Sequence, residues 1–197
     1  MIFNCILAGV GGQGTVLASK LIAQAAMKRG LSARTAETIG MAQRGGCVVS
    51  HVRFGKNIYS PMIAKHTADI IIGFEPAEAV RCLPYLKKGG TVVVSGKAIK
   101  PVTASLAGSS YNGSDMIEYL KENAAKVIVI DSDQICEACG SAKVLNVVLL
   151  GAAASSGLLG LTQDELEDAV KERINTRYVD MNTKALALGV QAAAKYK

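Results

Sequence analysis

A glycine-rich segment near the start of the chain has the residue types and spacing of a phosphate-binding turn. It separates a short apolar run, Ile2–Leu7, from an amphipathic stretch, Thr15–Lys28. Between a strand and a helix, the N–H groups of the turn and of the helix N-terminus bind an anion, and glycines let it approach closely. The alternative is a tight turn whose glycines serve only packing. The cofactor-binding residues predicted in this turn are Gly9, Gly11, Gly12, Gln13 and Gly14.

A dinucleotide-binding fingerprint also requires an acidic residue about 20 positions further on, at the end of the second strand. Glu37 lies 23 positions beyond Gly14, but Thr38, Ile39 and Gly40 still follow it. The match is loose, so a stand-alone NAD-binding oxidoreductase is kept only as an alternative interpretation.

The segment that follows carries an arginine among small and polar residues. Arg44 could present its guanidinium group to a carboxylate or a phosphate, and a solvated loop arginine is the alternative. In the next strand, alternation puts His51 and Arg53 on one face, so they could line the same cleft. A single strand histidine is more often a structural hydrogen-bonding group than a catalyst. The cofactor-binding residues predicted in this region are Arg44, Gly45, Gly46 and Arg53.

Cys136 and Cys139 form a Cys-x-x-Cys pair, which invites a redox or metal interpretation. An iron–sulfur cluster usually needs four thiolates, and Cys5, Cys47 and Cys82 have no matching spacing. We therefore interpret the pair as two cysteines one turn apart on a packed helix. The sequence predicts no structural zinc site, no nucleophile and no general base. This pattern is typical of a subunit that contributes to another chain's active site.

Short apolar runs alternate with helical stretches over the first two thirds of the chain. After the first strand, the runs predicted as strands are Ser32–Thr38, Cys47–Phe54, Asp69–Gly73, Thr91–Ser95 and Val127–Ile130. A turn at Gly55-Lys56-Asn57 is predicted to lead into Ile58–Ser60 as an antiparallel hairpin. The predicted helices are Thr15–Lys28, about Pro76–Leu86 with Gly89 and Gly90 at its exit, Ser114–Asn123 and Asp133–Gly140.

From Ala142 onward the chain is predicted to be helical. Thr162 and Glu165 have the spacing of a capping box, and a last helix is predicted from Val179 to Tyr196. No repeat or low-complexity linker interrupts the sequence, so we expect a single domain over residues 1–197. Strands alternating with helices predict a three-layer α/β/α fold with a mainly parallel sheet, a Rossmann-like opening and a helical C-terminus.

The composition excludes several function classes. Among 197 residues, 22 Lys and Arg against 16 Asp and Glu give a net charge of +6, but the basic residues are dispersed and aromatics are only 5%. Nucleic-acid binding is therefore not expected, and a surface facing an anionic cofactor or an acidic partner fits better.

No membrane span is expected either, because the most apolar window, Val144 to Leu161, is interrupted by polar residues and glycines. Five scattered cysteines without a signal peptide indicate a reducing cytoplasm.

Several motifs occur together in an order and spacing that resemble a known family. They are Gly9-Val10-Gly11-Gly12-Gln13-Gly14, Gly40-Met41-Ala42-Gln43-Arg44-Gly45-Gly46, Ser50-His51-Val52-Arg53, Ser60-Pro61, Gly73-Phe74-Glu75-Pro76-Ala77-Glu78 with Arg81, and Asn146 with Leu150-Gly151-Ala152. Over nearly the whole chain they resemble the gamma-type domain of the 2-oxoacid:ferredoxin oxidoreductases. The Met-Ala-Gln-Arg-Gly-Gly segment is most similar to the small beta subunit of indolepyruvate:ferredoxin oxidoreductase.

The resemblance implies a complex that oxidatively decarboxylates a 2-oxoacid, forms the acyl-CoA and passes electrons through iron–sulfur clusters to ferredoxin. It implies that thiamine diphosphate and the clusters belong to a large partner subunit, and that this chain is inactive alone. The corresponding domain of related enzymes is associated with coenzyme A, so the Gly9–Gly14 turn and Arg44 are implied to contact coenzyme A or the partner. His51 and Arg53 match the family pattern as well. A non-catalytic assembly module of such a complex is the alternative.

Overall fold

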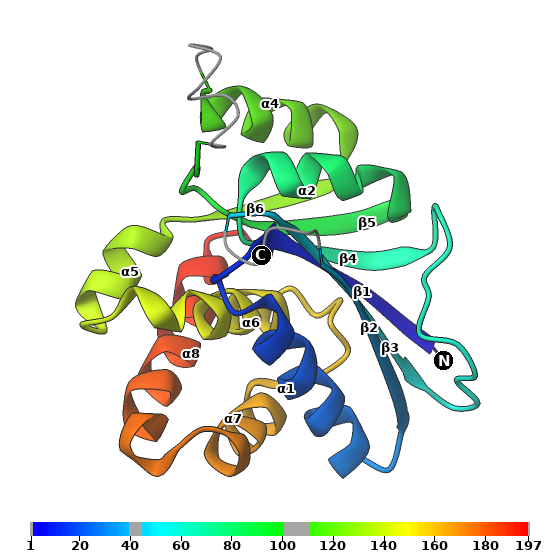
Figure 1. Ribbon diagram of the computed structural model, residues 1–197, viewed down its shortest axis with the longest axis vertical. Coiled ribbons are helices and arrows are strands. Elements are labelled where there is room, and N and C mark those ends of the chain that lie inside the picture. Colours follow the sequence, from blue (N-terminus) through cyan, green and yellow to red (C-terminus); the bar gives the residue numbers. More distant parts are fainter. Residues whose placement is uncertain (1, 40–44, 101–110, 197) are drawn as a thin grey trace.

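The computed structural model of the protein describes residues 2–39, 45–100 and 111–196 (Figure 1). The described strands form one six-stranded sheet in the order β2-β3-β1-β4-β5-β6. Across the sheet they are β2 (Ser32–Ile39), β3 (Cys47–Gly55), β1 (Ile2–Val10), β4 (Ala68–Gly73), β5 (Leu86–Ser95) and β6 (Lys126–Ile130). The strands β1, β4, β5 and β6 are parallel, whereas β3 is antiparallel to both of its neighbours. The prediction of a mainly parallel sheet is confirmed.

Helices cover both faces of the sheet and complete the predicted three layers (Figure 1). One face carries α2 (Pro76–Cys82), which continues into the 3-10 turn Leu83–Tyr85, and α4 (Gly113–Asn123). The other face carries α1 (Thr15–Lys28), α5 (Ser132–Ala138), α6 (Leu145–Ser155), α7 (Gln163–Arg173) and α8 (Val179–Ala194). Short 3-10 turns, Ala142–Val144 and Thr176–Tyr178, precede α6 and α8. The predicted helical C-terminus is confirmed.

Alternation along the strands fills the core on both faces. In β4, Ile70 and Ile72 join the core beneath α1 and α6, whereas Ile71 joins the core beneath α2 and α4. Successive strand side chains point to opposite faces, so a strand covered on both sides must be apolar throughout. This requirement explains why the sequence shows continuous apolar runs rather than an apolar–polar alternation.

The helices α6 and α8 approach each other closely at two glycines. A Cβ atom on Gly151 would lie 2.1 Å from the Leu186 carbonyl oxygen, and one on Gly189 would lie 2.0 Å from the Val148 carbonyl oxygen. The helix α6 is buried from Leu145 to Ala153.

In the described part of the chain, no single helix is long and apolar enough to cross a membrane. Only the pair of α5 with residues 142–155, bent by 120°, meets both criteria.

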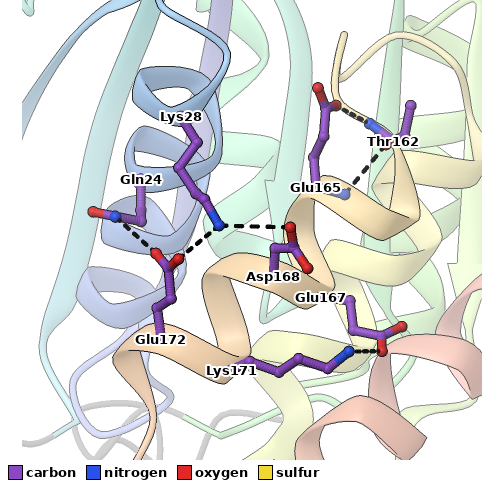
Figure 2. A network of polar contacts seen from close by, with 8 residues as sticks. All are labelled: Gln24, Lys28, Thr162, Glu165, Glu167, Asp168, Lys171 and Glu172. Carbon is purple, nitrogen blue, oxygen red and sulfur yellow. Dashed lines mark hydrogen bonds and ion pairs between the residues drawn. The ribbon is translucent and has the colours of Figure 1, made fainter.

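Charged side chains connect α7 to α1 on the surface (Figure 2). Lys28 Nζ lies 2.6 Å from Glu172 Oε1 and 3.5 Å from Asp168 Oδ2. The predicted capping box is confirmed: Glu165 N donates to Thr162 Oγ1 at 3.3 Å, and Thr162 N donates to Glu165 Oε2 at 2.8 Å. These contacts fix where α7 begins and which side of it faces α1.

Two local predictions are wrong. Residues 58–60, within the described chain, form no strand, because β3 pairs with β1 on one side and β2 on the other and leaves no free edge for a hairpin. The predicted helix exit at Gly89 and Gly90 is also wrong. The helix α2 ends at Cys82, and both glycines lie inside β5, which begins at Leu86.

Candidate functional site

The glycine turn lies at the carboxyl end of β1 and leads directly into α1. Gly12 and Gly14 have φ angles of 104° and 82°, a region that favours glycine. The Gln13 side chain closes the turn, because its Oε1 accepts a hydrogen bond from Val10 N at 2.8 Å and its Nε2 donates to the Phe74 carbonyl oxygen at 2.9 Å. Since Phe74 directly follows β4, Gln13 joins the ends of two neighbouring parallel strands.

Two of the glycines are required by packing inside the chain. A Cβ atom on Gly9 would lie 2.8 Å from Phe74 Cβ, and one on Gly14 would lie 2.9 Å from Asn146 Nδ2, which itself donates to the Gly14 carbonyl oxygen at 3.4 Å. A Cβ atom on Gly12, by contrast, would meet no atom of the described residues within 4 Å. Packing therefore accounts for Gly9 and Gly14, whereas the turn is open at Gly12.

The turn and the end of the arginine segment meet in space. Gly11 N donates to the Gly46 carbonyl oxygen at 2.8 Å, and Gly45 N donates to the Gly11 carbonyl oxygen at 3.3 Å. These hydrogen bonds continue the β1–β3 pairing beyond its last register pair, Val10 with Cys47. Two motifs that are far apart in the sequence therefore lie together at one end of the sheet. Arg44 lies outside the described residues.

A cavity of about 200 Å³ opens beside the turn, at the carboxyl ends of β1, β5 and β6. It is lined by Gly12, Gln13, Lys97, Ile99, Ser132, Asp133, Cys136, Ala142 and Leu145. In α/β sheets this edge is the usual place for a ligand. Lys97 Nζ lies 2.7 Å from Asp133 Oδ1, so its charge is already paired, while Ser95 Oγ and Ser132 Oγ bind each other at 2.6 Å. The cavity fits a phosphate-sized group rather than a whole nucleotide cofactor.

Arg53 lies at the other end of the sheet from the glycine turn. It pairs in register with Asn4, and its Nε donates to Asn4 Oδ1 at 2.9 Å. Its Nη1 donates to the carbonyl oxygens of Ser60 at 2.9 Å and Met62 at 3.2 Å. The structure therefore does not bring Arg53 together with the other predicted cofactor-binding residues. The Arg53 side chain instead binds the segment that follows β3.

His51 contacts the same segment. Its Nδ1 accepts a hydrogen bond from Ile63 N at 3.2 Å, and its ring lies edge-on to Tyr85 with a centroid separation of 5.4 Å. The side chain is buried, and desolvation by burial lowers the pKa of His51 below its ordinary value. A neutral imidazole that accepts from a backbone N–H is a structural group, as interpreted from the sequence.

No role was predicted for Glu75, a buried carboxylate that follows β4 by two residues. Glu75 is 2% exposed; its Oε2 accepts from Glu78 N at 3.0 Å and caps α2, while its Oε1 accepts from Ile99 N at 3.4 Å and from the Tyr111 hydroxyl group. Burial, together with the hydrogen bond to Glu75, raises the pKa of Tyr111 above its ordinary value. The Glu75-Pro76 pair after a strand is an N-cap signal that could have revealed it.

Three of the cysteines, Cys5, Cys82 and Cys136, are buried, and Cys47 and Cys139 are partly buried. All five lie in the described residues and none forms a disulfide. Cys136 is buried in α5, where desolvation raises its pKa to about 11, and Cys139 is the C-cap residue of that helix. A thiol with a raised pKa is a poor nucleophile at neutral pH. Among the residues that the structure describes, no group of three or more His, Cys, Asp or Glu side chains is placed to hold a metal ion.

Comparison with known proteins gives consistent matches over nearly the whole chain. The family described as pyruvate ferredoxin/flavodoxin oxidoreductase matches residues 4–192. Indolepyruvate oxidoreductase subunit IorB is 35% identical in Thermococcus kodakarensis, over 97% of this chain and 96% of that one. The same subunit of Archaeoglobus fulgidus is 38% identical, over 98% and 96%. The pyruvate/ketoisovalerate oxidoreductase common subunit gamma of Thermococcus kodakarensis is 26% identical, over 90% and 89%.

Solved structures show the same fold. The gamma subunit of a keto/oxoacid ferredoxin oxidoreductase from Geobacter sulfurreducens aligns with a TM-score of 0.72 at 23% identity, over 98% of this chain and 99% of that one. The 2-oxoglutarate:ferredoxin oxidoreductase of Magnetococcus marinus, solved with 2-oxoglutarate, coenzyme A and succinyl-CoA bound, aligns with a TM-score of 0.74 at 20% identity. There the whole of this chain matches only 32% of the other. The chain belongs to the pyruvate ferredoxin/flavodoxin oxidoreductase family.

Proposed function

We propose that the protein is the small subunit of an indolepyruvate:ferredoxin oxidoreductase. The observation that carries the proposal is the 34–38% identity to four indolepyruvate oxidoreductase IorB subunits, against 24–26% for the common gamma subunits of pyruvate/ketoisovalerate enzymes. The proposal includes oxidative decarboxylation of a 2-oxoacid to the acyl-CoA, with electrons passed to ferredoxin. It treats residues 1–197 as one gamma-type domain and keeps the cytoplasmic location expected from cysteine usage.

The proposed complex contains a larger partner subunit that holds thiamine diphosphate and the iron–sulfur clusters. The Magnetococcus marinus chain supports this arrangement, because two thirds of its length lies beyond the region matched by this domain. The absence of a convincing nucleophile or base in the sequence fits a subunit that completes a site formed mainly by another chain.

Coenzyme A is the ligand we propose for the turn and the adjoining cavity. When bound, it supplies the thiol that accepts the acyl group. The open side at Gly12, the N–H groups at the start of α1, which no side chain of the described residues caps, and the phosphate-sized cavity are suited to one phosphate group of the cofactor. Because Lys97 is paired with Asp133, the additional positive charge is assigned to Arg44, next to Gly45 and Gly46. The role of Arg53 as a further cofactor contact stays a prediction.

Reconstitution with the large subunit tests the enzyme assignment. We expect viologen reduction that depends on both subunits, coenzyme A and indolepyruvate, with slower turnover of pyruvate and of 2-ketoisovalerate. Equal turnover by the large subunit alone would refute the proposal. Turnover of pyruvate in preference to indolepyruvate would refute only the substrate.

A matched pair of arginine variants tests the coenzyme A contact. Arg44→Ala should raise the KM for coenzyme A about 10-fold or more and leave the KM for the 2-oxoacid unchanged, because a charge-assisted phosphate contact is lost. Arg34→Ala, on the exposed edge strand β2, is the control and should leave both constants unchanged. An unchanged KM for coenzyme A in Arg44→Ala would instead favour the assembly-module alternative.

A further inference from the structure

The segment that joins β3 to β4, residues 56–67, exposes apolar side chains between buried anchors. It projects from the sheet beside the N-terminus (Figure 1). Tyr59 is 89% exposed and Met62 is 52% exposed, whereas Ile58 and Ile63, which flank them, are 4% and 3% exposed. We call the four residues from Tyr59 to Met62 the tip. Its ends are fixed in the core, and its apolar side chains point outward.

The backbone of the tip is held in one conformation. Arg53 donates to the carbonyl oxygens of Ser60 and Met62, and Met62 N donates to Ser60 Oγ at 3.2 Å. Pro61 restricts its own φ angle. Such a segment loses little conformational entropy on binding, which favours affinity for a partner.

The rest of the segment is bound to the sheet and to the 3-10 turn before β5. Asn4 Nδ2 donates to the Thr67 carbonyl oxygen at 3.0 Å, and His66 N donates to the Pro84 carbonyl oxygen at 3.0 Å. None of these contacts uses the side chains of Tyr59 or Met62. Within the described chain, the exposed phenol and thioether therefore have no structural role that would explain an apolar tip.

Residue type and charge indicate what binds the tip. Tyrosine and methionine are enriched at the centres of protein–protein interfaces. Residues 56–67 contain Lys56, Lys65 and His66 and no acidic residue. In a two-fold contact between copies of this chain, the same basic surface would face itself, and like charges would repel. A surface complementary to the tip would therefore combine an apolar pocket with a rim of carboxylates, which points to a different chain.

We propose that the tip docks into such an acidic-rimmed pocket on the large subunit. This inference rests on the proposed function and adds to it the surface that holds the complex together. The tip lies near the Ile2–Gly55 end of the β1–β3 pair, whereas Gly11 and Gly46 meet at the other end. Nine strand residues span roughly 30 Å, so docking and the glycine turn can be perturbed independently.

The test measures the equilibrium dissociation constant between the tagged full-length chain and the large subunit. Tyr59→Ala and Met62→Ala should each raise this constant at least 10-fold, and Lys56→Glu with Lys65→Glu should raise it and weaken its salt dependence. Tyr178→Ala, an exposed tyrosine before α8, is the control and should bind as the wild type does. Urea midpoints of the isolated variants should equal the wild-type midpoint, because the altered side chains are exposed.

The outcomes separate this inference from the proposed function. If Tyr59→Ala and Met62→Ala bind the large subunit with wild-type affinity, the docking surface is refuted and the proposed function stands. If the wild-type chain does not bind the large subunit, both are refuted. If sedimentation shows a wild-type homodimer that Tyr59→Ala dissociates, the tip binds a second copy and the inference is overturned.

Discussion

Replacing Gly14 by alanine tests whether the turn is shaped by Asn146 as well as by its own backbone. Two effects add at this position. A φ of 82° costs an L-residue about 1–2 kcal/mol, whatever surrounds it. The new methyl group would also lie 2.9 Å from Asn146 Nδ2 and 3.2 Å from Asn146 Cγ, an overpacking that costs about 1–3 kcal/mol. We therefore expect Gly14→Ala to reduce the free energy of unfolding by about 2–5 kcal/mol.

The two effects are separable because Asn146→Ala removes only one of them. In that background the nearest remaining atom is Asn146 Cβ, at 3.4 Å, which is an ordinary van der Waals contact. Gly14→Ala should then cost only the backbone strain of about 1–2 kcal/mol. The double-mutant cycle should show a favourable coupling of roughly 1 kcal/mol or more, beyond the scatter of about 0.5 kcal/mol expected for independent sites.

Urea unfolding of the four proteins, followed by far-ultraviolet circular dichroism, measures the cycle. In thermal unfolding the same coupling corresponds to roughly 2–4 °C in Tm for a chain of this size. Equal destabilisation by Gly14→Ala in both backgrounds would refute the steric part of the reasoning. A loss below about 1 kcal/mol in both would refute the backbone part as well.

Three further outcomes are expected. Gly189→Ala should lower the free energy of unfolding, measured in urea, by about 1–3 kcal/mol, because the methyl group meets the Val148 carbonyl oxygen, a backbone atom that cannot move aside. An unfolding midpoint equal to that of the wild type would contradict the close crossing of α6 and α8. A hydrogen bond from Arg29 lowers the pKa of Glu165, so the pair stabilises the protein above pH 4.5 and loses this effect as the pH falls through the lowered pKa. The difference in urea midpoint between wild type and Arg29→Gln should therefore be larger at pH 7 than below the lowered pKa, where only the hydrogen bond from Arg29 to the Gly160 carbonyl oxygen remains, and a difference that does not shrink in acid would refute the ionic contribution. Glu75→Gln should move the raised pKa of Tyr111 down toward 10, as measured by NMR of ¹³C-labelled tyrosine, and an unchanged titration would show that burial alone raises it.

Local signals in the sequence predicted most of the elements. Apolar runs predicted the strands β1, β4, β5 and β6, since residues buried on both faces must be apolar wherever the strand lies in the sheet. The glycine turn, the helix Thr15–Lys28 and the capping box at Thr162 were predictable because their signals span only a few neighbouring residues. The site was predictable to the same extent: the turn between β1 and α1 follows from local spacing alone.

Long-range pairing decided the rest. The sequence suggested that the strand at 47–54 forms a hairpin with the residues after it, but β1 and β2 occupy both of its edges. That placement joins Gly45 and Gly46 to the turn and leaves Arg53 at the far end, where it shapes the tip. Likewise, the contact of Gln13 with Phe74 exists only because β4 lies beside β1. Turn and helix signals depend on residues that are near neighbours in the sequence. Which strand edges pair depends instead on how the whole chain packs, so the order of the strands in the sheet cannot be predicted from local patterns.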